Sequence, residues 1–195
     1  MIRRACESDA AIIAEIYNQA IEDQLFATCD VTTVTVESRI PWLASHKDPF
    51  PSFVLEAETA GVLGWSALNR FSVRPTYPAI AELSVYVHRP YRNRLIGGRL
   101  FLHTIRIAKQ LGFQSLVSLT LEKNEPSIRG LMAAGFRRVA CLSEVAMLHD
   151  EWVDVVWLQK DLTGDWTKEL SGFMKRLCET RSFEIPQVKA NLDLR

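Results

Sequence analysis

One continuous stretch, AELSVYVHRPYRNRLIGG from Ala81 to Gly98, constrains the fold more than any other part of this chain. It begins with an apolar, β-branched run over Leu83–Val87, which predicts a buried strand. A basic loop follows, closes on two glycines and leads into a long helical pattern. Such a helix start offers free N–H groups and a favourable dipole to an anion. The stretch therefore predicts a strand followed by a turn that cradles a pyrophosphate, with Glu82 as the chemical group beside it.

Hydrophobic periodicity predicts the other elements and a mixed sheet. Pro41 falls near the middle of the second expected helix, so we expect a break there or a place in its first turn. The order of elements indicates an α/β (α+β) domain whose ligand binds at the carboxyl end of the central strand. Strands are expected at Ile2–Ala5, 53–57, 62–68, 83–87, 116–121, from Phe136 onward and at 153–158, and helices up to about Glu22 and at 36–46, 97–111 and 127–134.

Charge and cysteine usage exclude several classes of protein. The 195 residues carry 23 Lys and Arg against 23 Asp and Glu, so no basic excess indicates a nucleic-acid or membrane-surface binder. No run approaches the roughly 18 apolar residues of a membrane span, and the N-terminus does not resemble a signal peptide. The four cysteines form no C-x-x-C motif and the four histidines have no ligand-spaced partner, so no metal site is expected. We expect a cytoplasmic protein with free thiols.

The last part of the chain changes character. Residues 1–162 are expected to form one domain, and 163–195 a C-terminal extension of a helix and an irregular tail. Five apolar residues of the extension fit one helical stripe, which favours packing on the domain or on a second copy of the chain over a substrate role. These residues are Trp166, Leu170, Phe173, Met174 and Leu177.

A set of short motifs in a fixed order resembles the GNAT superfamily of acyl-CoA N-acyltransferases. Within it, the chain resembles the phosphinothricin and methionine sulfoximine acetyltransferase branch, from Ile2 to about Leu162. Any one match would be weak, and their order makes them specific. The matching residues are Ile16-Tyr17-Asn18, Thr28, Val36-Glu37, Arg39, Trp42-Leu43, Gly64-Trp65, Arg74-Pro75, Tyr77, Glu82, Ser84-Val85-Tyr86-Val87, Asn124, Ser127-Ile128, Gly135-Phe136, Trp152 and Asp154.

The resemblance implies a V-shaped split between two central strands, which acetyl-CoA enters as co-substrate. It implies that Glu82 is the general base and that Arg74 and Tyr77 hold the carboxylate or phosphinate of a small amino-acid-like amine. It also implies a homodimer. A direct transfer that requires no metal is expected rather than a cysteine acyl-enzyme, because no cysteine lies near these motifs with an adjacent base. The acetyl-CoA contacts that it implies are the strand backbone of Val85, Tyr86 and Val87, the turn of Arg92, Asn93, Arg94, Leu95, Ile96, Gly97 and Gly98, and Asn124 and Ser127 at the next helix start.

Two departures from the family pattern bear on activity. Leu95 replaces the first glycine of the turn, which costs binding if that position needs a positive φ. Leu131 stands where many of these enzymes carry a tyrosine that protonates the leaving thiolate. A non-catalytic acyl-CoA-binding module therefore stays open as an alternative. A protein or peptide N-acetyltransferase is a second alternative, which a broad acidic groove would favour.

Purely structural interpretations of the same residues also stay open. Glu82 can be a strand carboxylate in a salt bridge, and the 92–98 turn a plain basic surface loop. Arg74 and Tyr77 can be loop packing. Three tryptophans are expected in the core rather than at a site, namely Trp65, Trp152 and Trp157.

Overall fold

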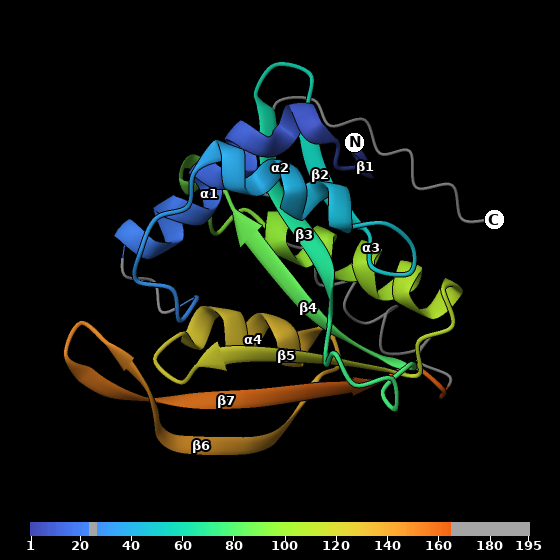
Figure 1. Ribbon diagram of the computed structural model, residues 1–195, viewed down its shortest axis with the longest axis vertical. Coiled ribbons are helices and arrows are strands. Elements are labelled where there is room, and N and C mark those ends of the chain that lie inside the picture. The colour runs from blue at the N-terminus through green and yellow to red at the C-terminus, as the bar shows by residue number, and fades with distance from the viewer. Residues whose placement is uncertain (24–26, 165–195) are drawn as a thin grey trace.

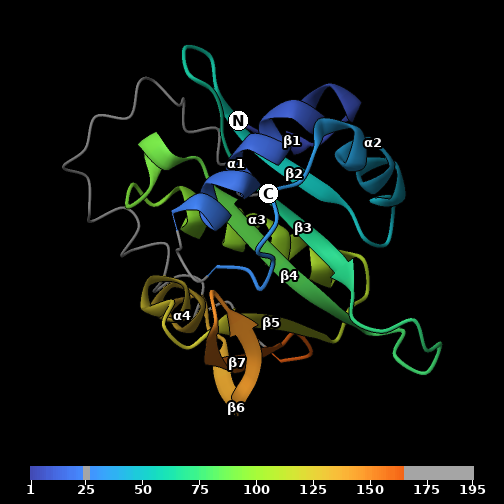
Figure 2. The same ribbon diagram turned by 60° about the vertical axis from the view of Figure 1, so that its left-hand side comes forward.

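The computed structural model describes residues 1–23 and 27–164, drawn in colour in Figures 1 and 2. The apolar stripe expected between 166 and 177 lies outside these residues. No described helix is both long enough and apolar enough to cross a membrane. The elements are β1 (Ile2–Arg4), η1 (Glu7–Asp9), α1 (Ala10–Glu22), α2 (Val36–Ser45), β2 (Ser52–Ala57), β3 (Gly61–Arg70), β4 (Ile80–Val87), η2 (Arg89–Tyr91), α3 (Ile96–Gln110), β5 (Ser115–Leu121), α4 (Glu125–Ala133), β6 (Arg137–Leu148) and β7 (Glu151–Asp161).

The strands form a seven-stranded sheet in the order β1-β2-β3-β4-β5-β7-β6. Neighbouring strands are antiparallel except for β4 and β5. These two run parallel, because helix α3 connects the end of β4 to the start of β5 at the opposite end of the sheet. This confirms the expected mixed, mostly antiparallel sheet flanked by helices.

The parallel pairing of β4 and β5 is short. Ile80–Glu82 pairs with Ser115–Val117, and the ladder stops there. Beyond that point β4 stays paired with β3 and β5 stays paired with β7, so the two halves of the sheet diverge, as Figure 1 shows. The edge of β4 that faces β5 therefore has no strand partner over 83–87 among the described residues.

Helices cover the two faces of the sheet separately. Figures 1 and 2 show α1 and α2 on one face of β2 and β3, and α3 on the other. The alternation of strand side chains explains this division, because successive residues point to opposite faces. Thus Val54 packs with the α1–α2 cluster, whereas Leu55 packs with Ile96 and Leu100 of α3.

The expectation that Pro41 interrupts the second helix is wrong. Helix α2 runs through Pro41, which lies well beyond its first turn. A proline removes one N–H bond, and other contacts hold this helix in place. The Thr35 hydroxyl accepts a hydrogen bond from the Ser38 N–H at 3.2 Å, and Leu43 is buried in the core.

Gly64 lets β3 and β4 lie close together where β4 faces the split. A Cβ atom at this position would lie 2.7 Å from the backbone carbonyl oxygen of Tyr86, and near side chains of α3. Because a backbone atom cannot turn away as a side chain can, even alanine would force the two strands apart.

We predict that Gly64→Ala destabilises the fold by about 1–3 kcal/mol, the usual cost of overpacking a core. The free energy of unfolding from urea titration measures this effect. Gly130→Ala is the matched control, because its Cβ would meet Phe101 at an ordinary 3.5 Å and alanine favours a helix. Equal stability of Gly64→Ala and the wild type would contradict the prediction.

Candidate functional site

A cavity of about 630 Å³ opens where the strands diverge, on the face that α1 and α2 cover. Glu82, Ser84 and Tyr86 line it together because alternate residues of a strand share one face. The opposite wall comes from β5 and the β6–β7 hairpin, and includes Leu119 and Trp157. Glu82 is the last residue of the parallel ladder, so it lies where the sheet opens into the cavity.

The carboxyl group of Glu82 is largely buried and has no counter-charge. It makes no hydrogen bond or ion pair with any residue in the described part of the chain, so the salt-bridge interpretation finds no support there. Burial raises the pKa of Glu82 above its ordinary value, because desolvation penalises the charged form. A carboxylate in this state is well suited to accept a proton near neutral pH.

A chain of hydrogen bonds fixes the polar groups beside Glu82. Asn69 of β3 lies opposite Glu82 in the sheet and donates from Nδ2 to the Ser84 Oγ at 2.9 Å. Its Oδ1 lies 3.1 Å from the His46 Nε2, and the His46 Nδ1 lies 2.7 Å from the Trp42 carbonyl oxygen. This chain connects helix α2 with the strand that carries Glu82.

A second cavity, of about 320 Å³, lies against the same carboxylate. Arg74 and Tyr77 line it from the loop before β4, together with Glu82. The Tyr77 ring packs edge-on against Phe71 at 5.4 Å, which in turn packs edge-on against Trp157 at 6.0 Å. The structure thus brings Arg74 and Tyr77 to the group predicted as the base, with Glu82 common to both cavities.

The turn predicted to hold a phosphate has a positive φ at Leu95, which is the condition under which leucine in place of glycine is expected to cost binding. Leu95 precedes α3 with φ 62°, in the left-handed region that glycine adopts freely. Asn93 is also left-handed, with φ 61°. The Arg99 N–H bonds to the Leu95 carbonyl, so the earlier N–H groups of the helix have no acceptor within the helix itself.

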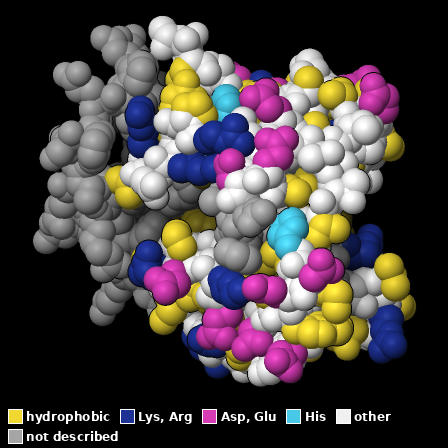
Figure 3. All heavy atoms as spheres, turned by 90° about the vertical axis from the view of Figure 1, so that its left-hand side faces the viewer, with side chains coloured by type: hydrophobic (Ala, Val, Ile, Leu, Met, Phe, Trp, Pro, Cys, Tyr) yellow, Lys and Arg dark blue, Asp and Glu magenta, His cyan; other side chains and the backbone are white. Residues whose placement is uncertain are grey.

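The arginines of this turn are not equivalent. Arg92 pairs with Asp23 at the end of α1 through Nη1 and Oδ2, 2.5 Å apart, and Arg89 pairs with the same carboxylate at 2.8 Å. Hydrogen bonds from Arg89 and Arg92 hold the pKa of Asp23 below its ordinary value. Arg94 makes no ion pair with any described residue. Figure 3 shows basic and acidic side chains interspersed over this end of the molecule.

The start of α4 is built as expected. Asn124 is the N-cap residue, and its Oδ1 accepts a hydrogen bond from the Ser127 N–H at 3.2 Å. This cap orients the first turn of the helix. Leu131, farther along the same helix, is fully buried, so no acid can act from that position.

Helix α2 contributes a wall to which the sequence analysis gave no role. Arg39 and Trp42 line the larger cavity, and His46 follows at helical spacing behind them. The signal in the sequence was the spacing of Arg39, Trp42 and His46 at i, i+3 and i+7, which places the three residues on one face of the helix. Trp65 is buried as expected and also lines the cavity, whereas the expectation of a core Trp152 is wrong. Trp152 is 58% exposed, because it lies next to the turn of the β6–β7 hairpin.

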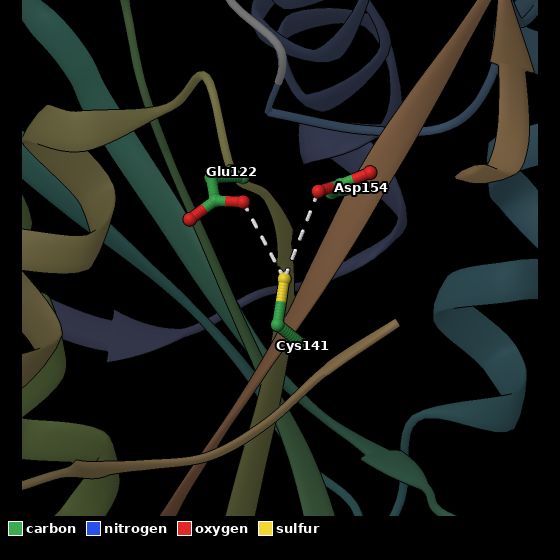
Figure 4. Close-up of side chains that lie close together, drawn as sticks. All are labelled: Glu122, Cys141 and Asp154. Carbon is green, nitrogen blue, oxygen red and sulfur yellow. Dashed lines mark hydrogen bonds between the residues drawn. The ribbon is translucent and has the colours of Figure 1, made fainter. Parts of the chain in front are cut away.

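Three potential metal ligands that are distant in sequence lie together near the end of β5 (Figure 4). One ligand atom each of Glu122, Cys141 and Asp154 lies within 4.8 Å of the others. Arg138 pairs with Glu122 at 2.5 Å and lowers the pKa of that carboxyl. Hydrogen bonds from the Cys141 thiol and the ion pair with Arg138 therefore account for the proximity of these three side chains, and a bound cation is not required to explain it.

Comparison with known proteins agrees with this geometry. The model of the Acetyltransferase (GNAT) family matches residues 14–136. The chain is 27% identical to the phosphinothricin N-acetyltransferase of Streptomyces coelicolor, over 83% of this chain and 95% of that protein. It is also 27% identical to the L-methionine sulfoximine/L-methionine sulfone acetyltransferase of Salmonella typhimurium, over 83% and 94%. The structure of yncA from Salmonella typhimurium with its cofactor acetyl-CoA superposes with a TM-score of 0.79, at 27% identity over 84% and 94%.

We predict that Glu82→Gln is more stable than the wild type at pH 7. The raised pKa means that the native state holds its proton more tightly than the unfolded chain, so the wild type loses stability as pH rises through the native pKa. The stability advantage of Glu82→Gln should vanish below pH 4.5, the ordinary pKa of the glutamate side chain in the unfolded chain. Melting temperatures across this pH range measure it, with exposed Glu58→Gln as the control. A difference that does not change with pH would contradict the assignment.

Proposed function

The chain belongs to the acetyltransferase (GNAT) family, and we propose that it transfers the acetyl group of acetyl-CoA to the primary amine of a small amino-acid-like substrate of the phosphinothricin or methionine sulfoximine type. The observation that carries this proposal is the buried carboxylate of Glu82, which has no partner in the described part of the chain and lies at the junction of two cavities. The names of the relatives support the substrate class.

Acetyl-CoA is proposed to lie along the edge of β4 that no other described strand occupies. The backbone of Val85, Tyr86 and Val87 would pair with the pantetheine arm as an added strand would. The turn over 92–98 would hold the pyrophosphate, and Asn124 with Ser127 would contact the cofactor from the start of α4. The structure of yncA with acetyl-CoA supports the choice of co-substrate.

The proposed reaction is a direct transfer. An alkyl ammonium is not nucleophilic until it loses a proton, and Glu82, directly or through water, is the group placed to accept it. The nitrogen then attacks the thioester carbonyl, the C–N bond forms, and backbone N–H groups stabilise the oxyanion. The C–S bond breaks and the thiolate of CoA leaves. Because a thiolate is a fair leaving group, the buried Leu131 in place of an acid does not block the reaction.

Arg74 and Tyr77 are proposed to hold the carboxylate or phosphinate of the acceptor. Both line the smaller cavity against Glu82. A guanidinium can bind such a group through two parallel hydrogen bonds. The amine of the acceptor would then lie at the carboxylate that both cavities share.

A non-catalytic acyl-CoA-binding module is the second candidate, and Leu131 favours it, because this buried residue stands where many of these enzymes carry a tyrosine that protonates the leaving thiolate. Glu82 counts against this candidate, because a binding module does not need a proton acceptor that has no partner among the described residues.

We predict that the protein releases CoA thiol when incubated with acetyl-CoA and a member of an amino-acid panel that includes phosphinothricin and methionine sulfoximine. Glu82→Gln should lower turnover by roughly 10²–10⁴-fold at neutral pH, the usual worth of general base catalysis. Its dissociation constant for acetyl-CoA should be unchanged. Thiol release with a colorimetric reagent and titration calorimetry provide the two measurements.

Glu58→Gln is the control, because this exposed carboxylate lies in the β2–β3 turn away from both cavities. Unchanged turnover in Glu82→Gln would remove Glu82 from the mechanism. Tight acetyl-CoA binding without thiol release for any amine would favour the binding module.

We predict that Leu95→Gly binds acetyl-CoA more tightly than the wild type. Glycine removes the side chain from the residue that precedes the free N–H groups of the helix. The left-handed strain of about 1–2 kcal/mol that it also relieves is present without cofactor and should therefore add to the stability of the fold rather than to the affinity. Leu95→Ala should gain much less, because it keeps the Cβ. Calorimetric dissociation constants compare the three proteins, and equal affinities would show that the cofactor does not approach this residue.

A further inference from the structure

Arg39 is a buried arginine that has no polar partner within residues 1–23 and 27–164. Its side chain comes from α2, lines the larger cavity, and belongs to a residue that is only 9% exposed. It makes no hydrogen bond or ion pair with any residue that the structure describes, and its buried Nε has no acceptor there. Burying an unpaired charge is costly, so an arginine in this state indicates a missing anion.

Aromatic rings hold the Arg39 guanidinium in place. Its central carbon lies 4.5 Å from the centre of the Tyr17 ring and 5.2 Å from that of Trp42. Such contacts contribute about 0.5–2 kcal/mol and use the faces of the rings. They orient the guanidinium but leave its N–H donors, which lie in its plane, without acceptors.

The acidic groups of the cavity do not neutralise Arg39. Asp30 and Glu82 are the carboxylates among the residues that line it. Asp30 accepts a hydrogen bond from the Tyr17 hydroxyl at 2.6 Å and makes no ion pair with Arg39. Glu82 lies across the cavity on β4, also unpaired. The cavity thus holds a fixed positive group and a fixed proton acceptor on different walls.

We infer that Arg39 binds an anionic or strongly polarised oxygen group at the far end of the acceptor side chain. The inference rests on the proposed function, which places the amine at Glu82 and an acidic group of the acceptor at Arg74, and it takes that acidic group to be the α-carboxylate. Because Glu82 lines both cavities, the two substituents of the amine-bearing carbon can extend in opposite directions. Arg39 then selects acceptors by their side chain, such as amino acids that end in a phosphinate, carboxylate or sulfone.

The test compares two acceptors in Arg39→Met and the wild type: phosphinothricin, with an anionic side chain, and methionine, with a neutral one. We expect the KM for phosphinothricin to rise about 10- to 100-fold, as for a lost charge-assisted hydrogen bond, with little change in kcat. The KM values for methionine and acetyl-CoA should stay unchanged. Arg39→Lys should recover part of the loss, and Arg129→Met, on the exposed face of α4, is the matched control.

Equal loss for both acceptors, or no loss for either, would overturn the inference while the proposed function stands. If the wild type acetylates no amine, the proposed function fails, and calorimetric binding of phosphinothricin then decides the inference. Binding that is present in the wild type and lost in Arg39→Met supports it, and absent binding or unchanged binding overturns it. Should Arg39→Met fail to fold, as judged by its thermal unfolding, Arg39→Lys carries the same comparison.

Discussion

The parallel ladder between β4 and β5 stops after three residues on each strand, and the other features of the site depend on that early end. Had it continued, the edge of β4 would be occupied and Glu82 would face a closed sheet. Instead β5 follows β7 away from β4, and the Gly64 contact keeps β4 pressed against β3. The opening between β4 and β5 is therefore a product of strand pairing.

The charges around the opening fall into two groups, one at the turn before α3 and one in the larger cavity. At the turn before α3, Asp23 compensates Arg89 and Arg92, so the basic loop is held in place before any ligand arrives. In the cavity, Glu82 and Arg39 have no such compensation within the described chain. In the proposed function the compensated arginines keep the turn in shape for the pyrophosphate, whereas Glu82 and Arg39 are the groups left to meet the acceptor. This contrast separates the arginines of the turn from the arginine of α2.

Local patterns in the sequence predicted most of the sheet, because the β-branched runs at 53–57, 83–87 and 116–121 are distinctive. They also placed Glu82 beside the strand over 83–87, since the two are neighbours in the chain. They failed for Pro41, where the N-cap at Thr35 and the burial of Leu43 outweigh the loss of one hydrogen bond. The role of Arg39 depends on which helix lies over which strand, and no local pattern contains that information.

One carboxylate shared by two cavities has a consequence for how such an enzyme diversifies. The loop at 71–79 shapes one cavity and helix α2 shapes the other, and neither contributes to the strand edge or to the turn before α3. In the proposed reaction, substitutions in either wall would therefore alter which amines are accepted without touching the residues assigned to the donor. Acceptor preference would then be a modular trait, open to independent drift at each end of the substrate.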